Sequence, residues 1–152
     1  KISGHYVNSI LAKTEATLAG FDEAIMLTQQ GDVSEGSGEN LFLINDGHIS
    51  TPPVAHNNLT GITRDSVTKI ATEDLGYKVV ERQVRRSELY FADEVFLTGT
   101  AAHIQAVGEL DNRTIGTGAE GPITKEIKEI FLDALTGTTP KYRKWCEVVN
   151  IP

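Results

Sequence analysis

The sequence predicts a single α/β domain with a mixed sheet, and three observations lead to this fold class. Short apolar runs typical of strands alternate with segments in which apolar residues recur every three or four positions, as in helices that bury one face. Turn pairs of Gly and Asp between neighbouring strand segments predict hairpins, which join antiparallel strands. The 152 residues contain no internal repeat or linker, so residues 1–152 are expected to form one domain.

The sequence of the first half of the chain predicts two helices and two strands, with turns between them. The expected helices cover residues 7–20 and 63–75, and the expected strands cover residues 23–29 and 40–45. Gly31-Asp32 and Asp46-Gly47 are typical hairpin turns. A polar loop with two prolines precedes the second helix, and Gly76 is placed to end that helix.

The second half predicts three strands and one long helix. The expected strands cover residues 77–84, 94–98 and 103–110, with a helical turn at 87–91. Gly121-Pro122 is a typical helix start, and Gly137 follows the last position of the pattern. Apolar residues at 123, 127, 130, 131 and 134 form one stripe on this helix, which we interpret as core packing.

Composition excludes several classes of protein. A net charge of −7 and a pI near 5.0 argue against a surface that binds nucleic acid. No apolar stretch approaches the roughly 20 residues that a membrane helix needs, and the start lacks a signal peptide, so we expect no membrane partner and a cytoplasmic location. Cys146 is the only cysteine and the four histidines lack paired spacing, so we expect no metal site.

Three short motifs could hold a ligand, although each has a simpler interpretation. Glycines on either side of Ser37 allow the backbone to approach a ligand beside the carboxylate of Glu35, but such a segment is often only a turn. The helix start at Gly61-Ile62-Thr63 favours an anion such as phosphate. Alternatively, Thr63 only caps its own helix. A third turn of small residues covers residues 98–102.

The spacing of these pieces together resembles the signature of the class IV (fold-type IV) aminotransferases, which use pyridoxal 5′-phosphate (PLP). The matching positions are Glu35, Ser37, Asn40, Leu41, Phe42, Ile49, Thr51, Leu59, Gly61, Ile62 and Arg64. Further matches lie at residues 1–6, 89–96, 99–102 and 121–125. The chain is most similar to branched-chain amino-acid aminotransferases, mainly through the Gly-Thr-Ala-Ala turn at 99–102.

The resemblance implies a fold and a place in a larger enzyme. The fold would be the C-terminal large domain of the D-amino-acid aminotransferase-like type, a mixed-sheet pseudo-barrel with flanking helices. A smaller N-terminal domain, which supplies further groups to the cofactor and substrate in the family, would be missing from this chain. The family also forms homodimers or larger assemblies, so a homo-oligomer is expected.

The resemblance also assigns the residues that contact the cofactor ring. Lys1 matches the family lysine that forms the Schiff base with PLP and moves the substrate proton. Tyr6 matches the tyrosine that hydrogen-bonds the ring oxygen. Glu35 matches the carboxylate that pairs with the ring nitrogen and favours its protonated form.

Two anions are assigned to neighbouring backbone segments. Ile62, Thr63 and Thr100 match the donors to the cofactor phosphate. Thr100, Ala101 and Gly38 match groups that bind the substrate. Among these, the turn at Thr100 and Ala101 offers backbone N–H groups to the substrate α-carboxylate. Small residues at 99–102 fit this role because bulky side chains would keep the backbone away from either ligand.

The implied reaction is reversible transamination of leucine, isoleucine or valine with 2-oxoglutarate. A D-amino-acid aminotransferase or aminodeoxychorismate lyase of the same fold is an alternative, and a catalytically silent domain is another. Because the N-terminal domain is missing, we expect little or no activity from this chain alone.

Overall fold

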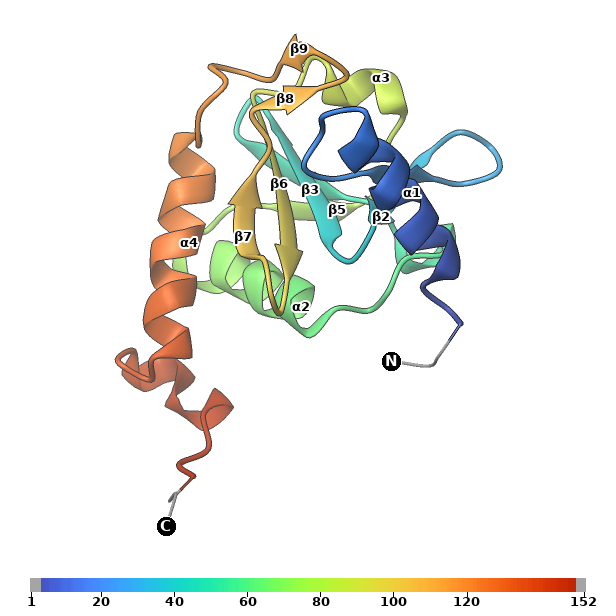
Figure 1. Cartoon of the computed structure of the whole chain (residues 1–152). Coiled ribbons are helices and arrows are strands. Elements are labelled where there is room, and N and C mark those ends of the chain that lie inside the picture. The colour runs from blue at the N-terminus through green and yellow to red at the C-terminus, as the bar shows by residue number, and fades with distance from the viewer. Residues whose placement is uncertain (1–3, 150–152) are drawn as a thin grey trace.

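A five-stranded sheet in the order β5-β4-β3-β6-β7 is the centre of the computed structural model, which describes residues 4–149 (Figure 1). Only the β4–β5 pair is parallel, and the other pairs are antiparallel. The predicted mixed α/β class is therefore confirmed. The five strands are β3 Asn40–Asn45, β4 His48–Thr51, β5 Val79–Glu81, β6 Glu94–Gly99 and β7 His103–Ala106.

The central strands β3 and β6 are apolar along their length because both faces of the sheet are covered. Successive side chains of a strand point to opposite faces. Phe42 and Ile44 accordingly belong to one core cluster, whereas Leu41 and Leu43 belong to a second cluster on the other face. Phe42 stacks on Phe96 of β6, with ring centroids 5.0 Å apart. The apolar run at 40–45 thus reflects burial on two sides.

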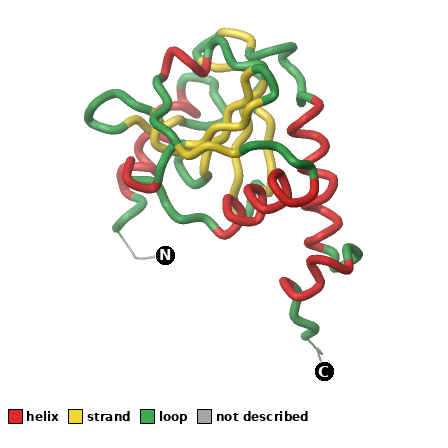
Figure 2. The backbone as a smooth tube through the Cα atoms, turned by 180° about the vertical axis from the view of Figure 1, so that it is seen from behind, coloured by secondary structure: helices red, strands yellow, loops and turns green. Residues whose placement is uncertain are grey.

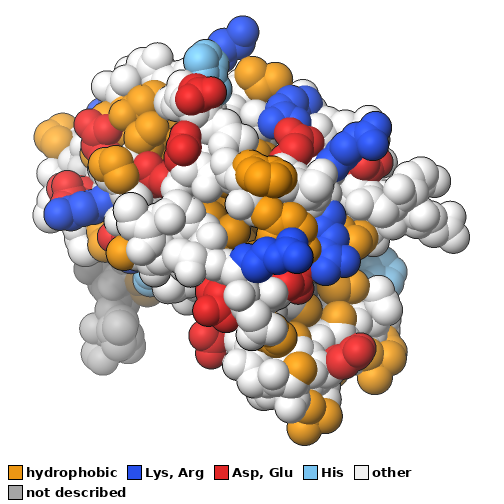
Figure 3. All heavy atoms as spheres, turned by 90° about the horizontal axis from the view of Figure 1, so that it is seen from above, with side chains coloured by type: hydrophobic (Ala, Val, Ile, Leu, Met, Phe, Trp, Pro, Cys, Tyr) orange, Lys and Arg blue, Asp and Glu red, His pale blue; other side chains and the backbone are white. Residues whose placement is uncertain are grey.

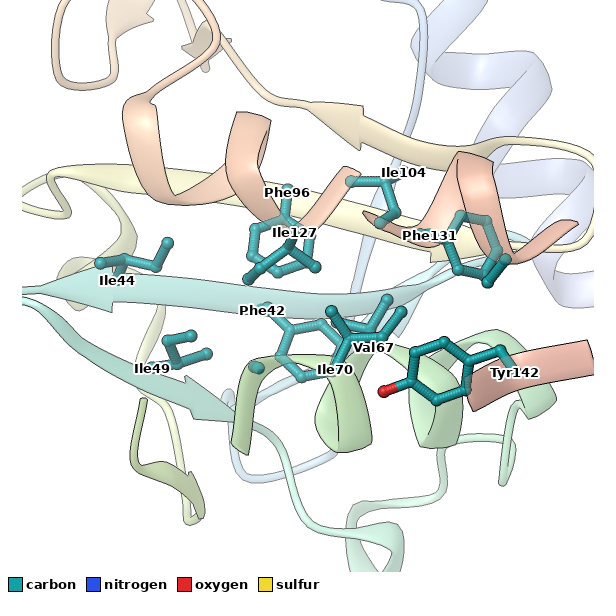
Figure 4. Close-up of a cluster of buried hydrophobic side chains, with 12 residues drawn as sticks. Phe42, Ile44, Ile49, Val67, Ile70, Phe96, Ile104, Ile127, Phe131 and Tyr142 are labelled. Atoms are coloured by element: carbon teal, nitrogen blue, oxygen red, sulfur yellow. The ribbon is translucent and has the colours of Figure 1, made fainter. Parts of the chain in front are cut away.

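Helices α2 Ile62–Lys69 and α4 Pro122–Leu135 cover the first face (Figure 4). The predicted stripe on α4 is confirmed as core: Ile127, Phe131 and Ala134 are buried, and Ile123 and Ile130 pack against the same cluster. Tyr142, from the 3₁₀ helix Pro140–Trp145, completes this cluster.

Short elements cover the second face. The hairpin of β1 Ile25–Leu27 and β2 Val33–Gly36, the helical turn α3 Arg86–Leu89, and the hairpin of β8 Glu109–Leu110 and β9 Arg113–Thr114 surround a second buried cluster. An ion pair of 2.7 Å between Arg86 and Asp111 ties the β8–β9 hairpin to α3. Figure 3 looks onto this end of the molecule and shows basic side chains next to acidic ones.

Helix α1 Val7–Leu18 forms where the apolar spacing predicts a helix, yet in the described part of the chain it buries no residue. Four of its apolar side chains are more than half exposed: Val7, Ile10, Leu11 and Leu18. Figures 1 and 2 both place α1 and α4 on opposite sides of the sheet. The apolar face of α1 is therefore not part of either core cluster.

Several predicted boundaries are wrong. The strand expected at 103–110 ends at Ala106, and a hairpin follows whose turn residues, Asp111 and Asn112, have left-handed backbone angles. The helix expected at 63–75 changes into a π-helical turn over Ile70–Asp74. The strands expected at 23–29 and 77–84 are only three residues long. The 3₁₀ helix at 140–145 was not predicted, because its sequence contains no apolar repeat.

None of the described helices is long and apolar enough to cross a membrane.

Candidate active site

Glu35, on β2, is the carboxylate around which the candidate site is built. Its Oε2 atom accepts a hydrogen bond of 2.9 Å from the backbone N–H of Leu59 and one of 3.3 Å from Nδ2 of Asn40. Burial raises the pKa of Glu35, the Leu59 N–H lowers it, and the charge of Glu39 raises it, with a net increase. The side chain is thus a half-buried carboxylate held in one orientation, without a described cation as its partner.

Asn40, at the start of β3, joins three parts of the site. Its Nδ2 atom donates to Glu35 and also, at 2.8 Å, to the carbonyl oxygen of Leu59. Its Oδ1 atom lies only 2.1 Å from the position that a Cβ atom on Gly61 would occupy, so residue 61 must be glycine for this contact. On its other side Asn40 pairs with Thr98 of β6. One buried amide therefore sets the positions of Glu35, the loop before α2 and the end of β6.

The loop over residues 52–61 is held against β2 by further polar contacts. Asn58 is buried and donates to the carbonyl oxygen of Pro52 at 3.1 Å. The hydroxyl of Ser34 donates to the carbonyl oxygen of His56 at 2.8 Å. The buried guanidinium of Arg64 also donates to Pro52, at 3.3 Å. These bonds fix the start of α2 beside Glu35.

Helix α2 begins with uncapped N–H groups. Gly61 is the N-cap residue, and no described side chain makes a capping hydrogen bond. The interpretation that Thr63 only caps its own helix is therefore wrong. The first N–H groups of a helix have no partner within the helix, and the helix dipole favours an anion there. Thr63 itself is buried, whereas Ile62 is 83% exposed.

Two glycine-containing turns meet beside this helix start. The carbonyl oxygen of Gly38, in the turn between β2 and β3, lies 3.4 Å from the position of a Cβ on Gly99. Gly99 ends β6, and Thr100 and Ala101 follow it in an exposed turn. Glycine at 99 allows this close approach because any side chain would push the two turns apart.

The structure thus brings most of the predicted site residues into one region. Glu35 and the start of α2 are joined through Asn40, and Gly38 and the Thr100 turn are joined through Gly99. Tyr6 directly precedes α1 and is half-buried. Lys1 lies outside the described residues.

Sequence reasoning missed the residues that hold the site together. Asn40 and Asn58 received no role of their own, although both are buried amides. Their signal in the sequence is weak: Asn40 is a polar residue at the start of an apolar run, and Asn58 stands in a polar loop. Glu39 was also missed, and it contacts both turns.

A cavity of about 740 Å³ lies elsewhere, between α1 and the segments that contain β1, β7 and β8. Glu35, Thr63 and Thr100 do not line it. The candidate site is instead a surface of this chain, on which Gly38, Ile62 and Thr100 are exposed.

Within residues 4–149 no three side chains of His, Cys, Asp or Glu gather in a way that could hold a metal ion.

Comparison with known proteins identifies the family. The model of the amino-transferase class IV family matches residues 2–110. The chain belongs to this family. It is 46% identical over 150 residues to a branched-chain-amino-acid aminotransferase of Pseudomonas aeruginosa and 45% identical over 150 residues to that of Escherichia coli. Each match covers 99% of this chain and 48% of the relative.

Solved structures of the class IV family confirm the predicted fold. The T.th. branched-chain amino acid aminotransferase complexed with N-(5′-phosphopyridoxyl)-L-glutamate superposes with a TM-score of 0.95 at 51% identity, and covers 99% of this chain and 50% of its own. The PLP form of the enzyme from Thermobaculum terrenum gives a TM-score of 0.96 at 40% identity, over 99% and 49% of the two chains. The chain therefore spans about half the length of the class IV relatives that it matches.

Proposed function

We propose that this chain is the cofactor-holding half of a PLP-dependent branched-chain amino-acid aminotransferase, which transfers amino groups reversibly between leucine, isoleucine or valine and 2-oxoglutarate. The observation that carries the proposal is the oriented carboxylate of Glu35 beside an uncapped helix start. Family membership and the names of the relatives support the same reaction.

The described residues fit PLP, because a fixed carboxylate and free helix N–H groups lie close together. The half-buried Glu35 suits a protonated ring nitrogen, and the uncapped start of α2 suits a phosphate. The ring nitrogen of PLP would pair with Glu35, and the phosphate would bind Ile62, Thr63 and Thr100. Tyr6 would hydrogen-bond the ring oxygen, and Lys1 would carry the cofactor.

Each side chain has a defined task in this proposal. Bound PLP supplies an electron sink for the α-carbon of the amino acid. The carboxylate of Glu35 favours a protonated ring nitrogen, since a nearby negative charge stabilises the cation. Lys1 would move a proton at the substrate α-carbon, and the backbone of Gly38, Thr100 and Ala101 would orient the substrate.

The open surface of the candidate site supports a need for the other half of the polypeptide. The relatives are twice as long as this chain, and the apolar residues of α1 are exposed. We propose that the N-terminal domain completes the site and that this chain alone has little or no activity. Leucine-dependent glutamate formation by the chain, with and without the other half, tests this, and full activity of the chain alone would contradict it.

Absorption spectroscopy of the complete protein tests the cofactor assignment. Addition of PLP is expected to give a visible band that borohydride removes and that the Lys1→Ala variant lacks. Absence of the band in the complete wild-type protein would refute the assignment.

A matched pair of variants tests the role of Glu35. Hydrogen bonds to charged groups contribute about 1.5–3 kcal/mol, so Glu35→Gln is expected to lower transaminase activity by about 10- to 100-fold. Glu129→Gln, at an exposed position of α4, is the control and should leave the activity unchanged. Equal activity of the two variants would exclude Glu35 from the site.

The substrate range separates this proposal from its alternatives. Activity with D-amino acids and none with leucine would favour a D-amino-acid aminotransferase, and release of pyruvate from aminodeoxychorismate would favour the lyase. A homo-oligomer in the cytoplasm remains a prediction that light scattering and cell fractionation would test.

A further inference from the structure

Glu39 belongs to the turn that contains Gly38, and its side chain reaches toward the turn at Gly99. Its Oε2 atom accepts a hydrogen bond of 3.1 Å from the backbone N–H of Gly38 and lies 2.9 Å from the position of a Cβ on Gly36. Its Cγ atom lies 3.3 Å from the position of a Cβ on Gly99. The side chain therefore packs against the backbone of both turns, in space that these two glycines leave free.

A polar network continues from Glu39 to α1. The carboxyl of Glu39 lies close enough to that of Glu23 for the negative charge of Glu23 to raise its pKa. Glu23 in turn forms an ion pair of 2.7 Å with Lys13 of α1, and it accepts a hydrogen bond of 2.7 Å from the backbone N–H of Ala24. Since α1 buries no residue, the Lys13 contact is a specific link between this helix and the two turns.

We infer that Glu39 is a positioning residue: next to the Glu23–Lys13 ion pair, it fixes the turn at Gly38 against the turn at Gly99. It thereby sets where the backbone N–H groups of Thr100 and Ala101, which bind the α-carboxylate of the amino-acid substrate, lie relative to Gly38. This inference rests on the proposed function. It adds a network of three residues to which neither the sequence motif nor the family match gives a role.

The surroundings shift the pKa values of Glu39 and Glu23 in opposite directions. Burial raises the pKa of Glu39, and the negative charge of Glu23 raises it further. Burial opposes ionisation of Glu23, but the hydrogen bonds from Lys13, Ser37 and Ala24 outweigh it and lower its pKa. Glu23 therefore ionises more readily than Glu39.

Steady-state kinetics of the complete protein with leucine test the inference. Because small displacements of groups that position a substrate cost up to about 100-fold, Glu39→Ala is expected to raise KM for leucine by about 10-fold or more. The visible cofactor band should be retained, and kcat should change by less than about 3-fold. Glu39→Gln keeps the length of the side chain and the acceptor for Gly38, and its amide can donate to Glu23, so its KM should stay within about 3-fold of wild type.

Lys13→Ala extends the test to a residue that contacts neither turn. It should also raise KM, since Glu23 loses its anchor, whereas Glu129→Ala on α4 should not. Unchanged KM in both Glu39→Ala and Lys13→Ala, or an equal rise in Glu39→Ala and Glu39→Gln, would overturn the inference. A wild-type protein without a cofactor band or transaminase activity would refute the proposed function itself, which separates the two failures.

Discussion

Replacement of Asn40 by aspartate is the sharpest test of how the site is held together. The substitution keeps the shape of the side chain but turns its donating amide into a carboxylate. The new oxygen would face Oε2 of Glu35 at 3.3 Å and the carbonyl oxygen of Leu59 at 2.8 Å. Two favourable contacts would become contacts between acceptors, one of them between two negative charges.

The magnitude follows from the distance and from the ordinary pKa of a carboxyl. At 3.3 Å and an effective dielectric constant of about 20, two unit charges repel by about 5 kcal/mol. One carboxyl can instead take up a proton, which near pH 7 costs about 4 kcal/mol for a group with an ordinary pKa of about 4.3. Protonation is the smaller cost, so Asn40→Asp should lower the free energy of unfolding by about 4 kcal/mol near pH 7.

The sign of the pH dependence is fixed by the same reasoning. The pKa of the carboxyl pair is higher in the folded than in the unfolded state. The destabilisation is therefore absent below the unfolded pKa and grows as pH rises toward the folded pKa. Near pH 5 it should fall to about 1 kcal/mol, because proton uptake is then nearly free.

Urea unfolding of wild type and variant near pH 7 and near pH 5 measures this difference. Asn40→Ala is the matched control, since it loses the same hydrogen bonds without a new charge and should cost about 1–3 kcal/mol at both pH values. A loss of stability in Asn40→Asp that is the same at both pH values would refute the reasoning, since Asn40 would then not face Glu35.

Three further predictions concern stability. Glu94→Ala should lower the free energy of unfolding in urea by about 1–2 kcal/mol. The reason is that the buried carboxylate accepts hydrogen bonds of 3.0 and 2.8 Å from the first N–H groups of α4. An unchanged urea midpoint would contradict this capping role. Phe131→Ala should lower the free energy of unfolding by about 3–5 kcal/mol, since the side chain is 5% exposed and lies in the first core cluster. A decrease below about 1 kcal/mol would mean that the core around residue 131 collapses to fill the space or is not tightly packed. Burial opposes ionisation of Asp74, but the hydrogen bonds from Lys141 and Tyr142 outweigh it and lower its pKa. Wild type should therefore be more stable than Asp74→Asn near neutral pH, and this difference in the free energy of unfolding should shrink as pH falls below about 4. A difference that grows on acidification would show that the pKa of Asp74 is not lowered in the folded protein.

The sequence by itself determined the elements that contain long apolar patterns. The last helix was predicted because Ile127, Phe131 and Ala134 repeat at helical spacing, and that stripe alone marks the buried face. The strand at 40–45 was predicted because its apolar run is continuous. Local chemistry also located the ligand motifs, because glycine at a close approach and an uncapped helix start are properties of a few neighbouring residues.

Only the tertiary structure decided how these motifs meet. The contact between Asn40 and Leu59 spans 19 residues. The contact between Glu39 and Gly99 joins the turn before β3 to the end of β6, which pairs with β3. Whether a polar side chain is buried, and which backbone group it bonds, depends on segments distant in the chain, so no local pattern encodes it. For the same reason the apolar spacing of α1 predicted a helix but not that its apolar residues would be exposed.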